Sequence, residues 1–294
     1  MPSASFPYTL VDVFTDTALG GNGLAVVHDA DGLDEGTMLR FAREVRLSET
    51  TFVQSATEAG ADYRNRIWTT VEELPFAGHP SLGTAVALAR RRLEHEARYV
   101  QQTQSGHQPI EVHLDGTRAR AIMTQPPGAF GAEADSGEVM AAVGLRTDDA
   151  HVQAPQVVST GLGTLIAPVA QRDAVTRAVP DFAAVDALLE PLGVDNLYLA
   201  WPDPDGGKAH ARMFSHFVAG GEDPATGSAA GALCAYLAER LGWPGVEITQ
   251  GLEMGRPSHL RTEVHDRGVQ VGGDVVVLIE GTLFLDTEQR SVSP

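Results

Sequence analysis

The chain has 294 residues, of which 43% are hydrophobic and 20% are charged, and its formal net charge is −18. These proportions exclude a disordered chain and allow either one large core or two domains of ordinary size. The acidic balance argues against nucleic-acid binding, since the densest basic run is only Arg90–Arg92, at the end of a predicted helix where cations suit the dipole.

Alternating apolar residues and turn signals divide the first half into strands with two helices between them. Strands are predicted, in chain order, at residues 8–14, 24–27, 50–53, 63–69, 98–102, 110–114 and 119–125. One helix is predicted from about Asp34 and another from Pro80 to about Leu93. The segment from Pro126 to Ser136 has no periodicity and is interpreted as the domain boundary, which gives domains 1–127 and 128–294.

The second half is predicted to follow the same plan. Its strands are expected at residues 152–159, 164–169, 197–201, 209–214, 246–249, 259–265, 269–271 and 275–279. Helices are predicted over 182–189 and from Pro224 to about Leu241, and the tail 287–294 is expected to be frayed. The Pro80 and Pro224 helices carry little polar surface, so both should be buried. Each half is therefore expected to be a curved sheet around one helix, an α+β architecture.

A short phrase opens both of these apolar helices and is the clearest repeat in the chain. It reads HPSLGTA from His79 and DPATGSA from Asp223. Proline favours the first helical position, which predicts His79 and Asp223 as matching N-cap residues. A helix N-terminus binds carboxylate or phosphate well. The repeat is interpreted either as two ordinary helix caps or as the two sides of an anion-binding cleft between the halves. Because the motif occurs twice, the cleft is favoured.

Several titratable side chains near this cleft are candidates for acid–base chemistry. His79 is a poor helix cap and titrates near neutral pH, whereas capping alone would explain Asp223. Glu49 stands where a polar turn enters an apolar strand, and partial desolvation there would raise its pKa; the alternative is a surface glutamate. Glu72 and Glu73 precede the first repeat, and their adjacency suggests that one of them faces solvent.

Other catalytic patterns are missing from the sequence. A single cysteine, Cys234, excludes a disulfide framework, a cysteine-rich metal site and a two-thiol racemase. The histidines show no metal-ligand spacing, and Gly161-Leu162-Gly163 lacks the third glycine of a dinucleotide loop. We see no signal peptide and no apolar run near the ~20 residues needed to span a bilayer, so a cytoplasmic protein is expected. What is left is an acid–base reaction on a small acid, with no cofactor and no metal.

The two repeat motifs also carry a resemblance to a known family. Gly-His-Pro-Ser-Leu-Gly-Thr-Ala at 78–85 and Glu-Asp-Pro-Ala-Thr-Gly-Ser-Ala at 222–229 resemble the hallmark motifs of the phenazine-biosynthesis PhzF-like isomerase/epimerase family. Further segments match its pattern in order, at residues 11–14, 21–22, 48–52, 123–126, 159–161 and 212–214. Almost the whole chain is covered. The sequence departs from the pattern at Gly23, Thr70 and His216, where the family often has proline.

This resemblance implies a fold like that of diaminopimelate epimerase. Two similar domains related by a pseudo-two-fold would each wrap a curved mixed sheet around a central helix, with the site between them, and the last strands could return to the first domain. The resemblance also implies a homodimer, a small anionic metabolite as substrate, and no metal or nucleotide. The implied catalytic residues are Glu49, which would move the proton, with His79 and Asp223. The implied substrate-binding residues are Asn22, Ser48, Gly78, Gly227 and Ser228.

Three functions stay open at this point. The first is an isomerase in which Glu49 removes and returns a proton on a dihydro-hydroxyanthranilate-like carboxylate. The second is an amino- or hydroxy-acid epimerase, and the third is a non-catalytic protein that binds a small metabolite. Neither repeat contains a cysteine placed for thiol chemistry, so the proton chemistry is assigned to Glu49, outside the repeat.

Overall fold

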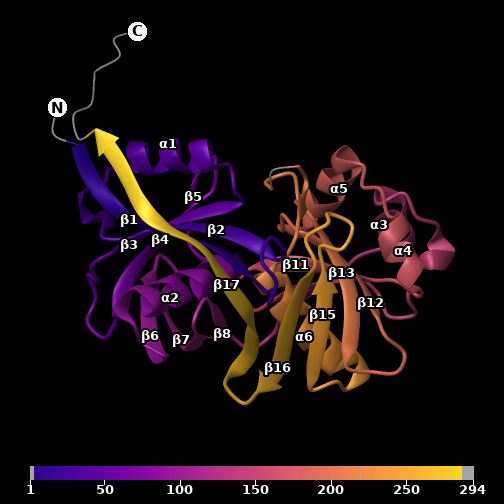
Figure 1. Ribbon diagram of the computed structural model, residues 1–294. Coiled ribbons are helices and arrows are strands. Elements are labelled where there is room, and N and C mark those ends of the chain that lie inside the picture. Colours follow the sequence, from indigo (N-terminus) through magenta and orange to yellow (C-terminus); the bar gives the residue numbers. More distant parts are fainter. Residues whose placement is uncertain (1–2, 219, 287–294) are drawn as a thin grey trace, which may run out of the picture.

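The computed structural model describes residues 3–218 and 220–286, and in this part of the chain six α-helices accompany a larger number of strands (Figure 1). The predicted frayed tail at 287–294 lies outside the described residues. The fold is a mixed α+β structure rich in β-strands. Two strand systems lie side by side, each around its own helix (Figure 1).

The first strand system is built around helix α2 (Gly78–Arg92), and helix α1 (Glu35–Val45) lies outside it. Its strands are β1 (Ser3–Val13), β2 (Asn22–Val27), β3 (Glu49–Gln54), β4 (Tyr63–Trp68), β5 (Glu73–Leu74), β6 (Glu96–Thr103), β7 (Gly106–Asp115) and β8 (Arg118–Gln125). The pairing is antiparallel between β1 and β2, parallel between β2 and β3, and antiparallel between β3 and β4. It is then parallel between β4 and β6, and antiparallel between β6 and β7 and between β7 and β8. The short strand β5 pairs with β4.

The second strand system repeats this pairing order around helix α6 (Gly227–Leu241). Its strands are β9 (Ala129–Glu133), β10 (Gln156–Ser159), β11 (Gly163–Pro168), β12 (Leu197–Pro202), β13 (Lys208–Phe214), β14 (Glu222–Asp223), β15 (Gly245–Gln250), β16 (Ser258–His265) and β17 (Gly268–Asp286). From β10 through β11, β12, β13, β15 and β16 to β17 the order is again antiparallel, parallel, antiparallel, parallel, antiparallel and antiparallel. The strand β14 pairs with β13 as β5 pairs with β4.

The long strand β17 belongs to both systems. Its first part pairs with β16 and with β8, and its residues from Val275 to Asp286 pair with β1. This second pairing closes the first system into a barrel around α2. The prediction of two separate strands at 269–271 and 275–279 was wrong. The glycine pair between them, Gly272-Gly273, lies inside one continuous strand and allows close packing, because a Cβ at Gly273 would lie 2.6 Å from Cδ1 of Phe14.

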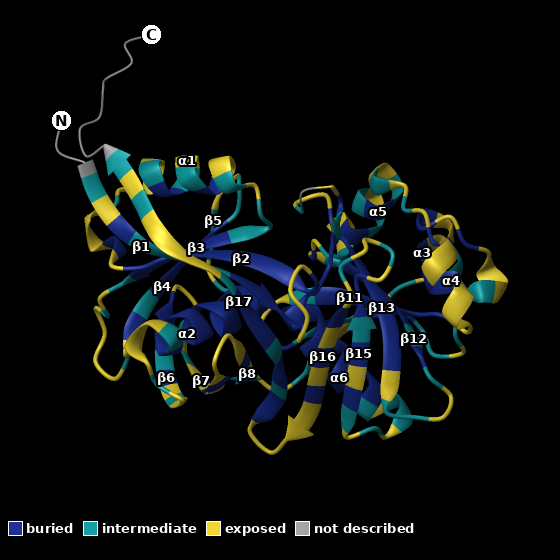
Figure 2. Ribbon diagram, viewed as in Figure 1, coloured by how far each residue is buried: buried dark blue, intermediate teal, exposed yellow. Residues whose placement is uncertain are grey.

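The main hydrophobic core surrounds α2 and α6, which are buried along most of their length (Figure 2). A second core lies under three outer helices, α3 (Ser136–Ala142), α4 (Arg172–Arg177) and α5 (Phe182–Leu189). A third, smaller core lies under α1. Short 3-10 turns occur at Ala30–Gly32, Thr147–Asp149 and Glu190–Leu192. The two buried helices explain the apolar runs that the sequence shows.

Most predicted elements are present, and the differences have local causes. Helix α5 has the predicted bounds, and α1 begins after Asp34, whose side chain caps it. The aperiodic segment after Pro126 was predicted to be a loop, but it contains β9. All residues of β9 are exposed, so it carries no alternation to detect. The helices α3 and α4 were not predicted, and the division at residues 127 and 128 stays a prediction.

Candidate active site

The N-termini of the two buried helices meet at the junction between the strand systems. A Cβ built on Gly78 would lie 3.0 Å from Cα of Gly227 and 3.1 Å from the backbone nitrogen of Ser228. The two backbones are therefore in direct contact, and any side chain at Gly78 would push them apart. The first N–H groups of each helix have no intrahelical acceptor, so two partially positive helix ends converge on one place.

The helix starts differ from those predicted, and this changes which residues correspond. Helix α2 has Ala77 as its N-cap, and α6 has Thr226. The prediction of His79 and Asp223 as matching caps was wrong: His79 is the second residue of α2, and Asp223 lies in β14, before the helix. Proline is tolerated throughout a first helical turn and in turns before one, so it does not mark the exact start. The true counterpart of His79 is Ser228.

A cavity of about 210 Å³ lies where these helices meet. Residues from both strand systems line it. The polar lining includes Ser48, Glu49, Gly78, His79, Asp223, Gly227 and Ser228, and the apolar lining includes Leu74, Phe76, Leu162, Met213, Phe217 and Val218. The structure thus brings together seven of the eight predicted site residues around one cavity. The eighth, Asn22, is hydrogen-bonded directly behind them.

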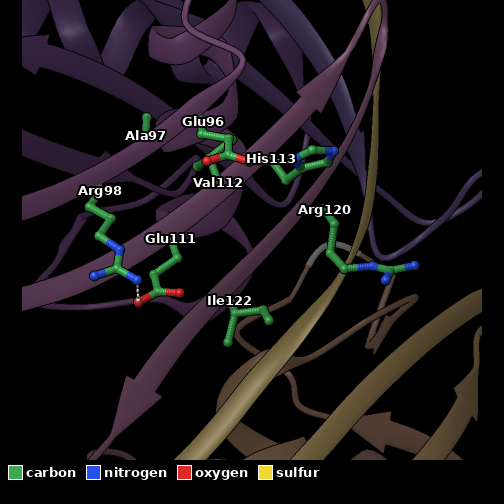
Figure 3. A pocket seen from close by; sticks show the side chains of 8 residues that line it. All are labelled: Glu96, Ala97, Arg98, Glu111, Val112, His113, Arg120 and Ile122. Atoms are coloured by element: carbon green, nitrogen blue, oxygen red, sulfur yellow. Dashed lines mark ion pairs between the residues drawn. The ribbon is translucent and has the colours of Figure 1, made fainter.

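A second hollow, on the outer face of β6, β7 and β8, has a different character (Figure 3). Its side chains include Arg98 and Glu111, which form an exposed ion pair of 3.5 Å. Such exposed pairs contribute little energy. None of the predicted site residues lines this hollow, so the cavity between the helices is the candidate site.

Glu49 and His79 form a buried pair at the cavity. Oε2 of Glu49 lies 3.4 Å from Nε2 of His79, and the side chains are only 15% and 4% exposed. Neither of these two atoms has a hydrogen-bond partner among the described residues. Burial raises the pKa of Glu49 well above its usual range, and the nearby Asp223 raises it further. Burial lowers the pKa of His79 to about 3, so the imidazole is neutral near neutral pH.

The carboxyl group of Asp223 is held by three side chains. Its Oδ1 accepts hydrogen bonds from Nδ2 of Asn22 at 2.8 Å and from Oγ of Ser48 at 3.3 Å, and its Oδ2 accepts one from Oγ1 of Thr226 at 2.6 Å. Burial raises the pKa of Asp223 to about 6, although these hydrogen bonds act in the opposite direction. The arrangement indicates an orienting group, since its oxygens are already occupied.

Asn22 links Asp223 to the histidine. Its Nδ2 also lies 3.0 Å from the carbonyl oxygen of Ala225 and 3.2 Å from Nδ1 of His79. An amide nitrogen has two N–H bonds, and the two shortest of its three contacts are those with Asp223 and Ala225. Nδ1 of the imidazole is turned toward Asn22, and Nε2 faces Glu49. The site therefore presents a ring nitrogen and a carboxyl oxygen side by side.

Some residues of the site were not found by sequence reasoning. Gln250 donates to the carbonyl oxygen of Asp223 at 2.8 Å and to Oγ1 of Thr226 at 3.1 Å, so it fixes the turn into α6. A glutamine at the end of an apolar strand and before Gly251 is the signal that could have found it. Of the two adjacent glutamates, exposed Glu72 lines the cavity and Glu73 pairs with Arg66 at 2.7 Å.

Residues 3–218 and 220–286 contain no group of three or more His, Cys, Asp or Glu residues that could hold a metal ion. Within the same described ranges, no helix has the length and apolar character to cross a membrane. Cys234 is buried in the core within α6, where burial raises the pKa of its thiol.

Comparisons with known proteins agree with the geometry. The family model PhzC-PhzF, phenazine biosynthesis-like protein, matches residues 11–281. The chain is 36% identical to trans-2,3-dihydro-3-hydroxyanthranilate isomerase of Pseudomonas fluorescens, with 95% of this chain and 99% of that protein covered. A solved structure of a predicted epimerase from Pseudomonas aeruginosa is 37% identical, covers 95% of this chain and 99% of its own, and has a TM-score of 0.84.

A more distant likeness concerns the fold alone. A hydroxyproline epimerase from Agrobacterium vitis is 12% identical and has a TM-score of 0.66, with 99% of this chain and 94% of that chain covered. The mixed α+β fold is therefore shared with proteins whose sequences have diverged widely.

Proposed function

The chain belongs to the PhzC-PhzF family and is an isomerase, and we propose that it moves a proton between two carbons of a small carboxylate-bearing substrate, with Glu49 as the group that carries the proton. By its name, the relative from Pseudomonas fluorescens isomerises trans-2,3-dihydro-3-hydroxyanthranilate. We propose a substrate of this type, a small cyclic amino-acid-like carboxylate. The observation that carries the proposal is the unpartnered Glu49–His79 pair facing the cavity.

The two helix N-termini are suited to hold the carboxylate of such a substrate. Backbone N–H groups of Gly78, His79, Gly227 and Ser228 lie at or next to the point where the helices meet. Their combined dipoles favour an anion without any arginine or lysine. The volume of about 210 Å³ suits a single small ring, and the apolar walls would contact its faces.

The proton step follows from the chemistry of the pair. The ionised carboxylate of Glu49 removes a proton from a carbon conjugated to the substrate carboxylate, so one C–H bond breaks and negative charge spreads into the conjugated system. The helix N–H groups stabilise that charge. The same carboxyl group then returns the proton to a second carbon, and the double bonds shift. The raised pKa of Glu49 brings its basicity closer to that of a carbon acid.

His79 is assigned a supporting role in this step. Its Nε2 lies 3.4 Å from Oε2 of Glu49, so a substrate oxygen in the cavity beside the pair can contact both atoms. A neutral imidazole can donate to that oxygen without introducing a charge of its own.

The alternatives differ from this proposal in the groups they need. A two-base epimerase needs a second free acid or base on the opposite face of the substrate. Asp223 already accepts hydrogen bonds from Asn22, Ser48 and Thr226, and the thiol of Cys234 is buried in the core. These contacts favour a single proton carrier. The non-catalytic possibility is set aside because three relatives that match 95% of this chain at 35–36% identity are isomerases by name.

The test uses trans-2,3-dihydro-3-hydroxyanthranilate in D₂O. We expect wild type to convert it and Glu49→Gln to be slower by a factor on the order of 10²–10⁴. The control is Glu44→Gln, an exposed carboxyl on α1 that should behave as wild type. Equal turnover by wild type and Glu49→Gln would overturn the proposal, and a product that differs only in configuration would identify an epimerase.

We further propose that the halves are two domains, 1–127 and 128–294, related by a pseudo-two-fold, with the end of β17 returning to the first. The repeated pairing order of the strands supports this. The homodimer and the cytoplasmic location stay predictions from the sequence, and sedimentation equilibrium would test the first of them.

A further inference from the structure

The connection between β15 and β16 reaches from the second strand system to the first. At its far end, Arg256 makes two hydrogen bonds to the turn that precedes β2 and one to Asp12 of β1. Its Nε donates to the carbonyl oxygen of Gly21 at 2.7 Å, and its Nη2 donates to the carbonyl oxygen of Gly20 and to Oδ1 of Asp12, both at 2.7 Å. A planar guanidinium can serve three acceptors in fixed directions, which a lysine cannot.

The turn held by Arg256 is strained and needs such contacts. Leu19 has a φ of 68° and Gly21 a φ of 60°. A left-handed conformation costs a non-glycine residue about 1–2 kcal/mol, so the turn persists only where its surroundings impose it. Asp12 also holds this turn, since its Oδ2 accepts a hydrogen bond from the backbone N–H of Leu19 at 2.7 Å.

The residue directly after this turn is Asn22, whose amide contacts Asp223, Ala225 and His79. A short path therefore leads from Arg256 through the carbonyl groups of Gly20 and Gly21 to the proton-transfer pair. The opposite end of the same connection is Gln250, which holds the turn from Asp223 to Thr226. One segment, residues 250–256, thus contacts both sides of the helix junction.

We propose that Arg256 is a positioning residue of the active site. It fixes the turn Leu19–Gly21 so that the Asn22 amide reaches both Nδ1 of His79 and Oδ1 of Asp223, which in turn keeps Nε2 of His79 directed at Glu49. The catalytic part of this inference rests on the proposed function, whereas the path of contacts does not.

Glu253 also anchors the connection between β15 and β16, at a place away from Arg256. Oε1 of Glu253 lies 3.2 Å from Nε2 of buried His210 and accepts a hydrogen bond from Oγ1 of Thr176 at 3.1 Å. These contacts hold the segment to β13 and α4 independently of Arg256. Replacing Arg256 should therefore loosen the turn before Asn22, which then keeps only the hydrogen bond from the backbone N–H of Gly21 to the carbonyl oxygen of Pro257 at 3.0 Å as its contact with this connection, and should leave the rest of the connection in place.

The experiment compares Arg256→Gln and Arg256→Lys with wild type. The control is Arg261→Gln, which removes an exposed arginine of β16 paired with Asp274 at 2.8 Å, away from the site. Without any substrate, NMR follows hydrogen exchange of the Asn22 side-chain amide and titration of the Asp223 carboxyl. We expect faster exchange in Arg256→Gln and titration of Asp223 at higher pH, because the hydrogen bond from Asn22 lowers the pKa of that carboxyl.

Turnover supplies the second measurement. We expect kcat of Arg256→Gln to fall by about 10- to 100-fold with a smaller change in KM, since small misplacements of reacting groups cost factors of this size. Arg256→Lys should recover part of the loss, and it carries the test if Arg256→Gln does not fold. Arg261→Gln should match wild type in every measurement.

The outcomes separate the two proposals. Unchanged Asn22 exchange and Asp223 titration in both Arg256 variants would overturn the positioning role, whatever happens to activity. A wild type that converts no trans-2,3-dihydro-3-hydroxyanthranilate would contradict the proposed function, and the substrate-free NMR measurements would still decide the role of Arg256.

Discussion

The contact between the two helix N-termini predicts that Gly78→Ala is far more damaging than an ordinary glycine replacement. The new Cβ would lie 3.0 Å from Cα of Gly227 and 3.1 Å from its carbonyl carbon. Carbon atoms pack at about 3.5–4.0 Å, so the helices must separate by a few tenths of an ångström. Overpacking of this kind lowers the free energy of unfolding by about 1–3 kcal/mol. The higher helix propensity of alanine compared with glycine offsets up to about 1 kcal/mol of this loss.

The effect on activity should exceed the effect on stability. A displacement of a few tenths of an ångström between the two halves of the site is expected to lower kcat/KM by up to about 10²-fold, while the melting temperature falls by only a few degrees. Gly227→Ala should be milder, because its Cβ would meet Gly78 only at 3.4 Å and the tip of Phe14 at 3.1 Å. Steady-state kinetics and calorimetry measure both quantities.

The matched control is Gly36→Ala, a replacement in the first turn of α1. Its new Cβ would meet only the ends of the Asp34 and Arg40 side chains. We expect unchanged kcat/KM and a melting temperature equal to or above that of wild type. Wild-type kcat/KM in Gly78→Ala would refute the reasoning from backbone contact.

Three further predictions concern stability and the lone thiol. The pKa of Glu49 is raised in the folded state, so the folded protein keeps a proton that the unfolded chain releases above the ordinary glutamate pKa of 4.5. Glu49 therefore destabilises the fold increasingly as pH rises beyond 4.5. Glu49→Gln should therefore raise the melting temperature at about pH 8 and by much less at about pH 4; an equal gain at both would contradict the shift. Leu82→Ala, in the middle of buried α2, should lower the free energy of unfolding in urea by about 2–5 kcal/mol, whereas exposed Val152→Ala should change it by less than about 0.5 kcal/mol. Cys234→Ala should retain isomerase activity, and the native thiol should resist alkylation because it is buried with a raised pKa; loss of turnover in that variant would argue for thiol chemistry.

Local patterns predicted much of this fold because many elements have a clear apolar face or run. Helix α5 was predicted with its observed bounds, and the two apolar helices were expected to be buried. The helix starts were less predictable. Pro80 and Pro224 look alike in sequence, yet one is inside its helix and the other precedes it. The actual register is set by the long-range contact of Gly78 with Gly227, which no local preference encodes.

The site was predictable as a set of residues and not as a geometry. Motif similarity selected Glu49, His79 and Asp223, but nothing in the sequence shows that the first two lie 3.4 Å apart without partners. Gln250 and Arg256 were missed because their contacts join residues far apart in the chain. Exposed β9 was missed for the opposite reason, since a strand without a buried face has no hydrophobic signature.

The pairing of β17 with β1 and β8 also determines when the first half can be completed during synthesis. These two strands form the seam of the barrel around α2, and their shared partner is the last described strand of the chain. Until residues 275–286 leave the ribosome, β1 keeps one open edge, and such edges invite pairing with other chains. Folding must also bring together segments from opposite ends of the chain, which slows it. The edge of β1 is therefore the part of the first half most open to pairing with another chain before β17 is made.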